Sequence, residues 1–382
     1  MTEGSDVAGR IARARAGVVA RGVSALLLGA GPDLVSLTGH RAPPLERLTA
    51  LVLPATGTPV LLAPRLEAMA AADCPAARAG ALEVESWDET DDPHRLVAAR
   101  LGLGSGRPGD ARVLVNGGLW ARHLLALQAA MPGAPFGLAD EVVGELRAVK
   151  EPGEIELLRR AARAADRVVA QIAAGRLVGR TEADLSREIR ARLVDEGHDA
   201  ASFAIVGSGP NSASPHHEPG ERRIGPGEPV VLDIGGTLEG YGSDITRTLW
   251  VTGPDAPREP DPAFVALFEL VRRAQAAATA AVRPGIPCED LDAVARDLIR
   301  AAGRGDEFIH RLGHGIGLEA HEAPYLVAGN REPIRPGMAF SIEPGVYEAG
   351  RWGARVEDIV VCADDGPIVL NEAGRDLVVV PG

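Results

Sequence analysis

The chain has 382 residues, of which 46% are hydrophobic, and it carries a formal net charge of −13 with a pI near 5.2. That length allows two domains with a sizeable core, and the composition is typical of a globular protein in water. Because an acidic surface repels phosphate backbones, the charge disfavours nucleic acid as a partner.

The three cysteines, Cys74, Cys288 and Cys362, lie far apart and form no CxxC motif. They indicate neither a disulfide framework nor a zinc site, and they are typical of reduced thiols in the cytoplasm. The N-terminus begins acidic and continues as an amphipathic helical pattern, and no apolar run is long enough to span a bilayer. We therefore expect a cytoplasmic protein with no membrane partner.

Residues 1–145 alternate short apolar strand candidates with helical patterns such as the one at 121–131. This alternation predicts an α/β domain. The glycine-rich segment 102–109 lacks the Lys-Ser/Thr ending of a phosphate-binding loop, so we predict a turn there and no cofactor-binding motif. The strand candidates are residues 24–29, 48–55, 58–63, 81–86 and 112–116.

A long helical pattern from Leu146 to Gly175 opens a second domain, predicted over residues 146–382. Pro152 lies just inside the start of this pattern, where helices favour proline, and acidic residues fill its first turns. The remaining predicted elements are a helix at 181–197, a strand-rich stretch to Val251, two helices within 260–302 and a second strand-rich stretch.

The two strand-rich stretches resemble each other. Each begins with Pro-Gly and places an acid seven residues later, Asp233 in one and Glu343 in the other. A glycine follows each acid by two positions, and a returning strand then carries a second acid, Asp244 or Glu357. The match predicts a duplicated half-domain and hence pseudo-two-fold symmetry.

The four acids predict a charged site. The segment 235–242 is predicted to be a hairpin loop, and antiparallel flanking strands would place Asp233 and Asp244 nearly opposite, with Cβ atoms about 5 Å apart. With Glu343 and Glu357 arranged likewise, four facing carboxylates need shared protons or a counter-charge, which two divalent ions would supply. The alternative is four unrelated exposed strand acids.

Three histidines, His310, His314 and His321, lie within twelve residues and are interleaved with glycines. The glycines disfavour a helix, so we expect an extended or looped segment in which backbones approach closely. Three purely structural histidines are the alternative, and they would leave the glycines unexplained. The pattern favours a crowded polar site that the histidines complete.

These motifs together resemble the pita-bread metallopeptidases, and within them the X-Pro aminopeptidases and prolidases. The motifs are GHGIG with a histidine seven residues after its own, LDIGG followed by SDITRT, SIEPGVY and RVEDIV. VSLTGHRAP near residue 35 and LRAVKEPGEIELLRRA near residue 146 extend the resemblance over nearly the whole chain. It implies a creatinase-like α/β N-terminal domain followed by an α+β pita-bread catalytic domain with pseudo-two-fold symmetry.

The resemblance also implies residue roles. Two metal ions would share five ligands, with Asp244 and Glu357 bridging them, and Glu343 would also shuttle a proton. His217 departs from the family pattern, and spacing favours its neighbour His216 as the substrate-side histidine. The implied metal ligands are Asp233, Asp244, His314, Glu343 and Glu357, and the implied catalytic residues are His216, His310, His321, Glu343 and Arg355.

One imidazole with four carboxylates makes a mostly hard-oxygen site, which suits Mn²⁺, with Co²⁺, Fe²⁺ or Zn²⁺ as alternatives. A water bridging two such ions is activated near neutral pH and would attack the scissile carbonyl. The implied activity is hydrolysis of the bond before proline in a small peptide, by an X-Pro aminopeptidase or an X-Pro dipeptidase. We expect a homodimer.

Three other functions are compatible with this type of fold. A creatinase-like C–N hydrolase acting on another small amide works without metal and lacks the full ligand set, whereas all five ligand positions are present here. A methionine aminopeptidase would share the ligands but would not need the α/β domain in front. A catalytically inactive interaction module would usually have lost ligands, and a measurement of bound metal distinguishes it.

Overall fold

The computed structural model describes residues 6–103, 111–253 and 257–382, so most of the turn expected at 102–109 lies outside the described residues. The chain divides into two compact units, Met1–Arg147 and Ala148–Gly382. The division falls two residues after the boundary expected at residue 145.

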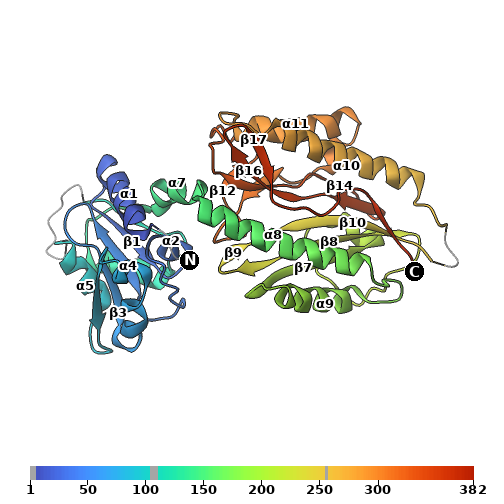
Figure 1. The fold of residues 1–382 in the computed structure, drawn as a ribbon. Helices are drawn as coiled ribbons and strands as arrows, with labels where there is room; N and C mark the ends of the chain where they lie inside the picture. The colour runs from blue at the N-terminus through green and yellow to red at the C-terminus, as the bar shows by residue number, and fades with distance from the viewer. Residues whose placement is uncertain (1–5, 104–110, 254–256) are drawn as a thin grey trace. The chain divides into compact units, whose positions relative to one another are not determined.

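The N-terminal unit is built on a mixed six-stranded sheet in the order β4-β3-β2-β1-β5-β6 (Figure 1). Strand β1 is buried on both faces: Leu26 and Leu28 join one hydrophobic cluster, and Leu27 joins another. This alternation follows from the two-residue period of a strand. The strands are β1 (Ala25–Gly29), β2 (Ala50–Pro54), β3 (Val60–Pro64), β4 (Glu83–Trp87), β5 (Val113–Val115) and β6 (Phe136–Leu138).

The first five strands coincide with the five strand candidates, so the α/β prediction is confirmed. Strand β6 escaped prediction because it is only three residues long and exposes Leu138. The helices that accompany the sheet are α1 (Val7–Ala20), α2 (Pro32–Thr38), α3 (Ala68–Ala72), α4 (Pro75–Arg78), α5 (Pro93–Arg100) and α6 (Ala121–Ala130), followed by α7 (Val143–Ala148).

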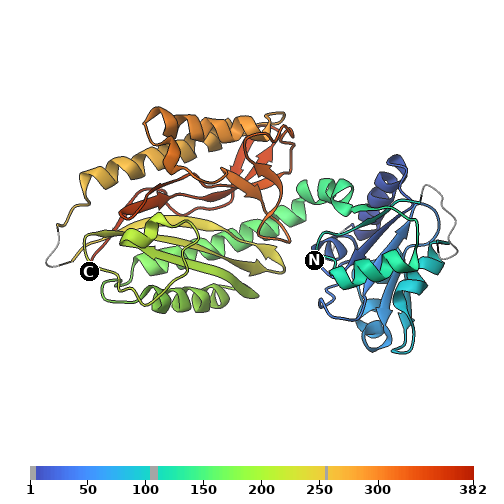
Figure 2. The ribbon, with the colours of Figure 1, turned by 180° about the vertical axis from the view of Figure 1, so that it is seen from behind.

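The C-terminal unit places its strands between helices. In both views α9 lies on one side of the strands, and α10 and α11 lie on the other (Figures 1 and 2). Helix α8 begins where the sequence predicts, with Pro152 in its first turn and a capping box formed by Glu151 and Glu154. The helices are α8 (Pro152–Ala173), α9 (Glu182–Asp195), α10 (Pro262–Ala281) and α11 (Cys288–Ala301).

Two main sheets carry the strands of this unit, in the orders β18-β10-β8-β7 and β12-β11-β13-β16-β17, and β14 pairs with β15. The first sheet contains β7 (Ala200–Ser208), β8 (Glu228–Leu238), β9 (Tyr241–Gly242), β10 (Ile245–Val251) and β18 (Val378–Val380). The remaining strands are β11 (Gly313–Gly315), β12 (Glu322–Leu326), β13 (Ala339–Ile342), β14 (Gly345–Glu348), β15 (Trp352–Arg355), β16 (Asp358–Ala363) and β17 (Gly366–Val369).

The halves of the C-terminal unit repeat the same backbone hydrogen bonds. Gly179 N donates to Ile224 O at 2.9 Å, and 106 and 110 residues later Gly285 N donates to Ile334 O at 2.8 Å. The repeat continues into the hairpins, where Gly227 N donates to Val251 O at 2.7 Å and Gly337 N donates to Cys362 O at 2.8 Å. The predicted duplication is therefore present in the backbone.

The register of the first hairpin corrects one prediction. Residues 235–242 do not form a loop: β8 continues to Leu238, and the turn consists of Glu239 and Gly240. Both turn residues have positive φ, 50° and 83°, as a tight two-residue hairpin turn requires. This turn pairs Asp233 with Thr246, so Asp244 is the diagonal neighbour of Asp233 and does not lie opposite it.

The second hairpin has a turn of three residues, Ala349 to Arg351. The extra residue changes the spacing of equivalent positions from 110 on the outgoing strand to 111 on the returning strand. Asp233 is therefore equivalent to Glu343, as predicted, but Asp244 is equivalent to Arg355 and Thr246 to Glu357. The prediction that Asp244 and Glu357 occupy matching positions is wrong.

No helix within the described residues is both long and apolar enough to cross a bilayer. Cys74, Cys288 and Cys362 are all buried as free thiols.

Candidate metal centre

The ends of the two hairpins enclose a cavity of about 260 Å³ in the C-terminal unit. One wall is apolar and the other carries acids and histidines. Its lining residues are Phe203, Ile205, Pro215, His216, Asp233, Asp244, His310, Arg311, His314, His321, Glu343, Arg355 and Glu357. All nine residues to which the sequence analysis assigned roles line this cavity.

Each acid lies near the point where a strand begins or ends. Asp233 lies on β8, Asp244 precedes β10, Glu343 follows β13, and Glu357 links β15 to β16. Oxygens of Asp233, Asp244 and Glu357 lie within 4.8 Å of one another, and atoms of His314, Glu343 and Glu357 form a second such group. The hairpins thus bring four carboxylates and one imidazole to a common centre.

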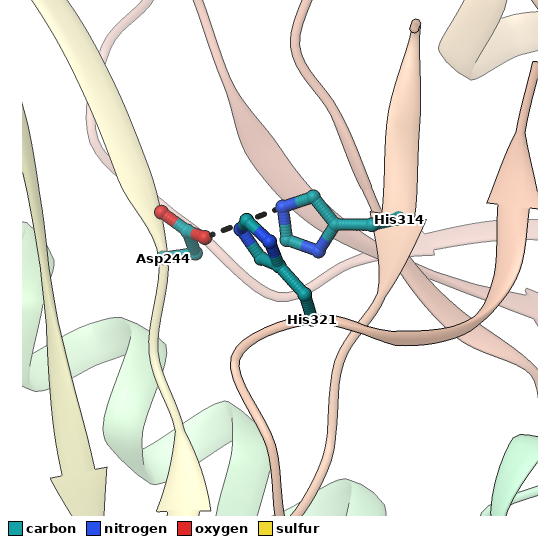
Figure 3. Close-up of side chains that lie close together, drawn as sticks. All are labelled: Asp244, His314 and His321. Carbon is teal, nitrogen blue, oxygen red and sulfur yellow. Dashed lines mark ion pairs between the residues drawn. The ribbon is translucent and has the colours of Figure 1, made fainter. Parts of the chain in front are cut away.

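The hydrogen bonds of His314 orient its ring. Nδ1 lies 3.1 Å from the carbonyl oxygen of Gly315, which can only accept, so Nδ1 carries the proton. In the neutral ring Nε2 then has a lone pair, and it faces Glu343 Oε1 at 3.2 Å and Asp244 Oδ2 at 3.7 Å (Figure 3). Facing lone pairs repel, so this arrangement suits a proton or a cation between them.

Two glycines allow the strand that carries His314 to fit between its neighbours. A Cβ atom on Gly313 would overlap the carbonyl oxygen of Ser341 on β13, and one on Gly315 would overlap that of Ala323 on β12. The segment is a short strand flanked by loops, as predicted from the glycines. Close backbone approach is therefore the structural reason for the glycines beside this histidine.

Burial and mutual repulsion govern the charges of the acids. Burial raises the pKa of Asp244 and Glu357 well above the usual range, and neighbouring carboxylates raise both further. Burial acts likewise on Asp233, although Arg355 opposes it. For Glu343 the hydrogen bond and charge of His314 outweigh burial and hold the pKa at about 2. The centre therefore needs positive charge before all four acids can ionise.

Two buried oxygens identify where such charge fits. Among the described residues, Asp233 Oδ1 and Glu357 Oε1 are buried and have no hydrogen-bond partner. A buried acceptor without a donor is costly, whereas a divalent cation satisfies several carboxylate oxygens at once. The donor set and these two oxygens fit divalent metal ions.

The non-ligand histidines surround the centre at different depths. The ring of His321 lies 3.9 Å from that of His314, and burial together with the charges of His314 and Arg311 lowers its pKa to about 4 (Figure 3). Burial also lowers the pKa of His310, whose Nε2 lies 2.9 Å from Tyr347 Oη. His216 is exposed at the cavity wall.

The adjacent histidines diverge. His216 lines the cavity, whereas His217 Nε2 lies 2.8 Å from the buried carboxylate of Glu182, away from the acids.

With this geometry in place, similarity to known proteins can be assigned. Residues 156–364 match the model of "Metallopeptidase family M24", and residues 10–149 match the "Creatinase/Prolidase N-terminal domain". The chain belongs to metallopeptidase family M24. Its two units thus correspond to the creatinase-like and pita-bread domains that the motifs implied.

Relatives of this M24 chain extend over its full length. It is 47% identical over 373 residues to the probable dipeptidase PepE of Mycobacterium tuberculosis, covering 97% of this chain and 96% of the relative. It is 35% identical to the Xaa-Pro dipeptidase of Lactobacillus helveticus, covering 90% and 91%. The crystal structure of dipeptidase PepE from Mycobacterium ulcerans superposes with a TM-score of 0.92 at 45% identity, covering both chains completely.

Sequence reasoning missed several contacts of this M24 site. Thr246 Oγ1 donates to Glu357 Oε2 at 2.7 Å and accepts from Arg355 Nε at 3.1 Å. The same guanidinium reaches Asp233 Oδ2 at 2.5 Å and Tyr347 Oη at 2.8 Å. Thr246 and Tyr347 stand inside the quoted motifs SDITRT and SIEPGVY, but a hydroxyl alone gives no sequence signal for what it contacts.

Proposed function

We propose that this chain is a metal-dependent peptidase that hydrolyses the amide bond before proline in small peptides. The observation that carries the proposal is the convergence of four carboxylates and His314 on one cavity with an apolar wall. The printed name of the Lactobacillus relative, an Xaa-Pro dipeptidase, supports the same substrate class.

Two divalent ions are proposed as cofactors, held by Asp233, Asp244, His314, Glu343 and Glu357. When bound, such ions polarise a scissile carbonyl and lower the pKa of an attacking water. The ligand set of four carboxylates and one imidazole favours Mn²⁺, with Co²⁺, Fe²⁺ or Zn²⁺ as weaker alternatives.

The proton transfer is assigned to Glu343. Its pKa of about 2 keeps the carboxylate ionised near neutral pH, so it can accept a proton from the attacking water. The same carboxyl can then deliver that proton to the departing proline nitrogen. Arg355 would hold Asp233 in its binding orientation through their 2.5 Å contact.

Substrate binding is assigned to the histidines and the apolar wall. His321 and His216 reach the cavity from opposite hairpins and can hydrogen-bond the substrate carbonyl as charge develops on its oxygen. Phe203, Ile205 and Pro215 offer the apolar surface that a proline ring requires. A cavity of about 260 Å³ suits a small peptide.

Arg311 favours dipeptides over longer substrates. Its guanidinium lines the cavity, stacks 4.5 Å from the Tyr325 ring centroid and approaches His321 Nδ1 at 3.5 Å. In an X-Pro dipeptide the proline carries a free carboxylate, which such a guanidinium can bind in a bidentate manner. A longer peptide has an amide at that position.

Hydrolysis of a peptide panel tests the function. With Mn²⁺ present, Ala-Pro should be cleaved faster than Ala-Pro-Ala, and Ala-Ala-Ala should be cleaved slowly or not at all. A chelator should abolish the activity, and restored Mn²⁺ should recover it. Failure to cleave any X-Pro bond would contradict the proposed substrate class.

A matched pair of arginine variants tests the preference for dipeptides. Arg311→Gln should raise the KM for Ala-Pro and leave the KM for Ala-Pro-Ala nearly unchanged. Arg351→Gln serves as the control, because Arg351 also stacks on an aromatic ring, that of Trp352 at 3.9 Å, but does not line the cavity. Equal effects of the two substitutions would remove Arg311 from the substrate site.

We also propose a homodimer located in the cytoplasm. The family resemblance supports the dimer, and three free, buried cysteines in an acidic chain agree with a reducing compartment. Light scattering of the metal-loaded protein and fractionation of cells test the two proposals separately.

A further inference from the structure

The paired histidines of SASPHHEP point to a device that orients one of them. The amide of His217 donates to Ser214 O at 3.2 Å, so residues 214–217 form a β-turn with Pro215 at its second position and His216 at its third. The direction of the His216 side chain therefore depends on how the two ends of this turn are held.

One end of the turn is held by Glu182, the first residue of α9, whose side chain is fully buried. His217 Nε2 lies 2.8 Å from Glu182 Oε2, and because a carboxylate only accepts, Nε2 must carry the proton. His217 itself is 19% exposed. The pair thus connects the turn to the start of a helix.

Glu182 collects further donors from the same segment. Its Oε1 accepts from Ser208 N at 2.8 Å, Ser208 Oγ at 2.7 Å and Asn211 Nδ2 at 3.0 Å, and its Oε2 accepts from Gly220 N at 3.5 Å. Although burial raises the pKa of Glu182, the bonds from Ser208, His217 and Asn211 outweigh it and lower the pKa. The carboxylate is therefore a charged anchor for residues 208–220.

The opposite end of the turn is held from the second hairpin. Both terminal nitrogens of Arg355 lie 3.4 Å from the carbonyl oxygen of Pro215, and Ser212 Oγ accepts from Gly353 N at 2.9 Å. His216 thus lies between an anchor on the second hairpin and an anchor on α9.

The equivalent position in the other half of the unit makes no such anchor. The helix start at Glu182 matches that at Cys288, since Glu182 N donates to Arg222 O at 3.0 Å and Cys288 N donates to Glu332 O at 3.0 Å. The shared backbone does not require a carboxylate there. The carboxylate occurs only in the half whose following loop carries His216.

We propose that Glu182 and His217 are positioning residues that direct His216 into the cavity. The inference rests on the proposed function, because the effect is exerted on the substrate through His216. His217 does not touch the reacting atoms, and its contribution passes entirely through its neighbour.

A double-mutant cycle tests the proposal on the Mn²⁺-loaded full-length chain with Ala-Pro. His216→Ala should lower kcat by about 10²-fold, as loss of a preorganised donor does. His217→Ala should lower kcat by about 10- to 100-fold, because misplacement by about 1 Å can cost 10²-fold. The double variant should lose no more than His216→Ala alone, since the second change acts through the first.

Conservative substitutions separate positioning from general stability. His217→Gln keeps an N–H near the Nε2 position and should recover most of the kcat lost in His217→Ala. Glu182→Gln should reproduce the loss, whereas Glu188→Gln on the same helix should keep full activity, since Glu188 contacts Arg180 and Arg192 and not the loop. Bound metal should remain at two ions in every variant.

Two results would overturn the inference. The first is a kcat for His217→Ala within about twofold of the wild type. The second is a full multiplicative loss in the double variant, which would mean that the histidines act independently. An inactive wild type would instead contradict the proposed function, so the two failures are distinguishable, and the His217 variants carry the test if Glu182→Gln does not fold.

Discussion

The first hairpin, β8 to β10, and the second, β13 to β16, share a backbone but differ in chemistry. Both start at a Pro-Gly with positive φ at the glycine and close the same hydrogen bond across their strands. On the outgoing strand both carry an acid, Asp233 or Glu343. On the returning strand, register places Asp244 opposite in role to its equivalent Arg355.

This difference teaches that a duplicated scaffold can build an asymmetric site. Two symmetric copies of Asp233 and Asp244 alone would provide four acids and no fixed positive side chain. In the observed site Arg355 replaces one acid and orients Asp233, while Glu357 restores the fourth carboxylate two residues further on. Symmetry therefore sets the positions, and substitutions at equivalent positions divide the roles.

The strongest test of the comparison removes the acid that has no acidic equivalent. Asp244→Asn should lower kcat more than about 10³-fold, since metal ions contribute several kcal/mol and 1.36 kcal/mol is tenfold in rate. Metal analysis should find fewer than two bound ions. Glu239→Asn in the turn of the same hairpin is the control, because asparagine tolerates its positive φ of 50°. Two tightly bound ions in Asp244→Asn would contradict its assignment.

The next largest effect separates the two stacked histidines. His321→Ala should keep both metals and lower kcat about 10²-fold, the loss expected for one donor to a developing oxyanion. His314→Ala should weaken metal binding, and its activity should partly recover at high Mn²⁺. Kinetics and metal content measured on both variants check the distinction. Full kcat in His321→Ala would exclude it from the reaction.

A smaller effect is expected at Thr246, the register equivalent of Glu357. Thr246→Val removes the hydroxyl that donates to Glu357 at 2.7 Å and accepts from Arg355 at 3.1 Å. Metal affinity should fall about 10- to 100-fold, as it does when a partner of a ligand is lost. Thr246→Ser should retain the wild-type affinity, measured by competition with a chelator. Equal affinities of all three proteins would show that the hydroxyl does not tune the site.

The smallest effect concerns stability at the equivalent helix starts, Glu182 and Cys288. Because the folded pKa of Glu182 lies below its unfolded value of 4.5, its charge stabilises the fold above about pH 4.5. This stabilisation is lost as pH falls through the folded pKa. Glu182→Gln should therefore cost about 1–3 kcal/mol near pH 7 and less at lower pH.

Thermal unfolding of the variants between pH 3 and pH 8 measures this dependence. Cys288→Ala is the control, because burial raises the pKa of this thiol to about 12 and it stays neutral throughout that range. Its cost should not change with pH. A cost of Glu182→Gln that is equally independent of pH would show that the charge of Glu182 is not what anchors the loop.

Much of this architecture could be predicted from local sequence signals. The strands of the N-terminal unit follow from short apolar runs, and α8 follows from Pro152 and its capping acids. The doubled Pro-Gly-to-acid spacing identified the duplication before any coordinates. The turn at Glu239 and Gly240 was missed because glutamate rarely adopts positive φ, so nothing in GGTLEGYG singled out those two positions.

The sequence by itself determined the chemistry available: four acids, the histidine cluster and the glycines that let them crowd. Only the tertiary structure decided which groups meet. Register is fixed by turn length, and a single extra residue in the second turn exchanged the partners of Asp244 and Glu357. The orientation of His216 likewise depends on Glu182, which lies 34 residues away in sequence and becomes a neighbour only when α9 packs against β7.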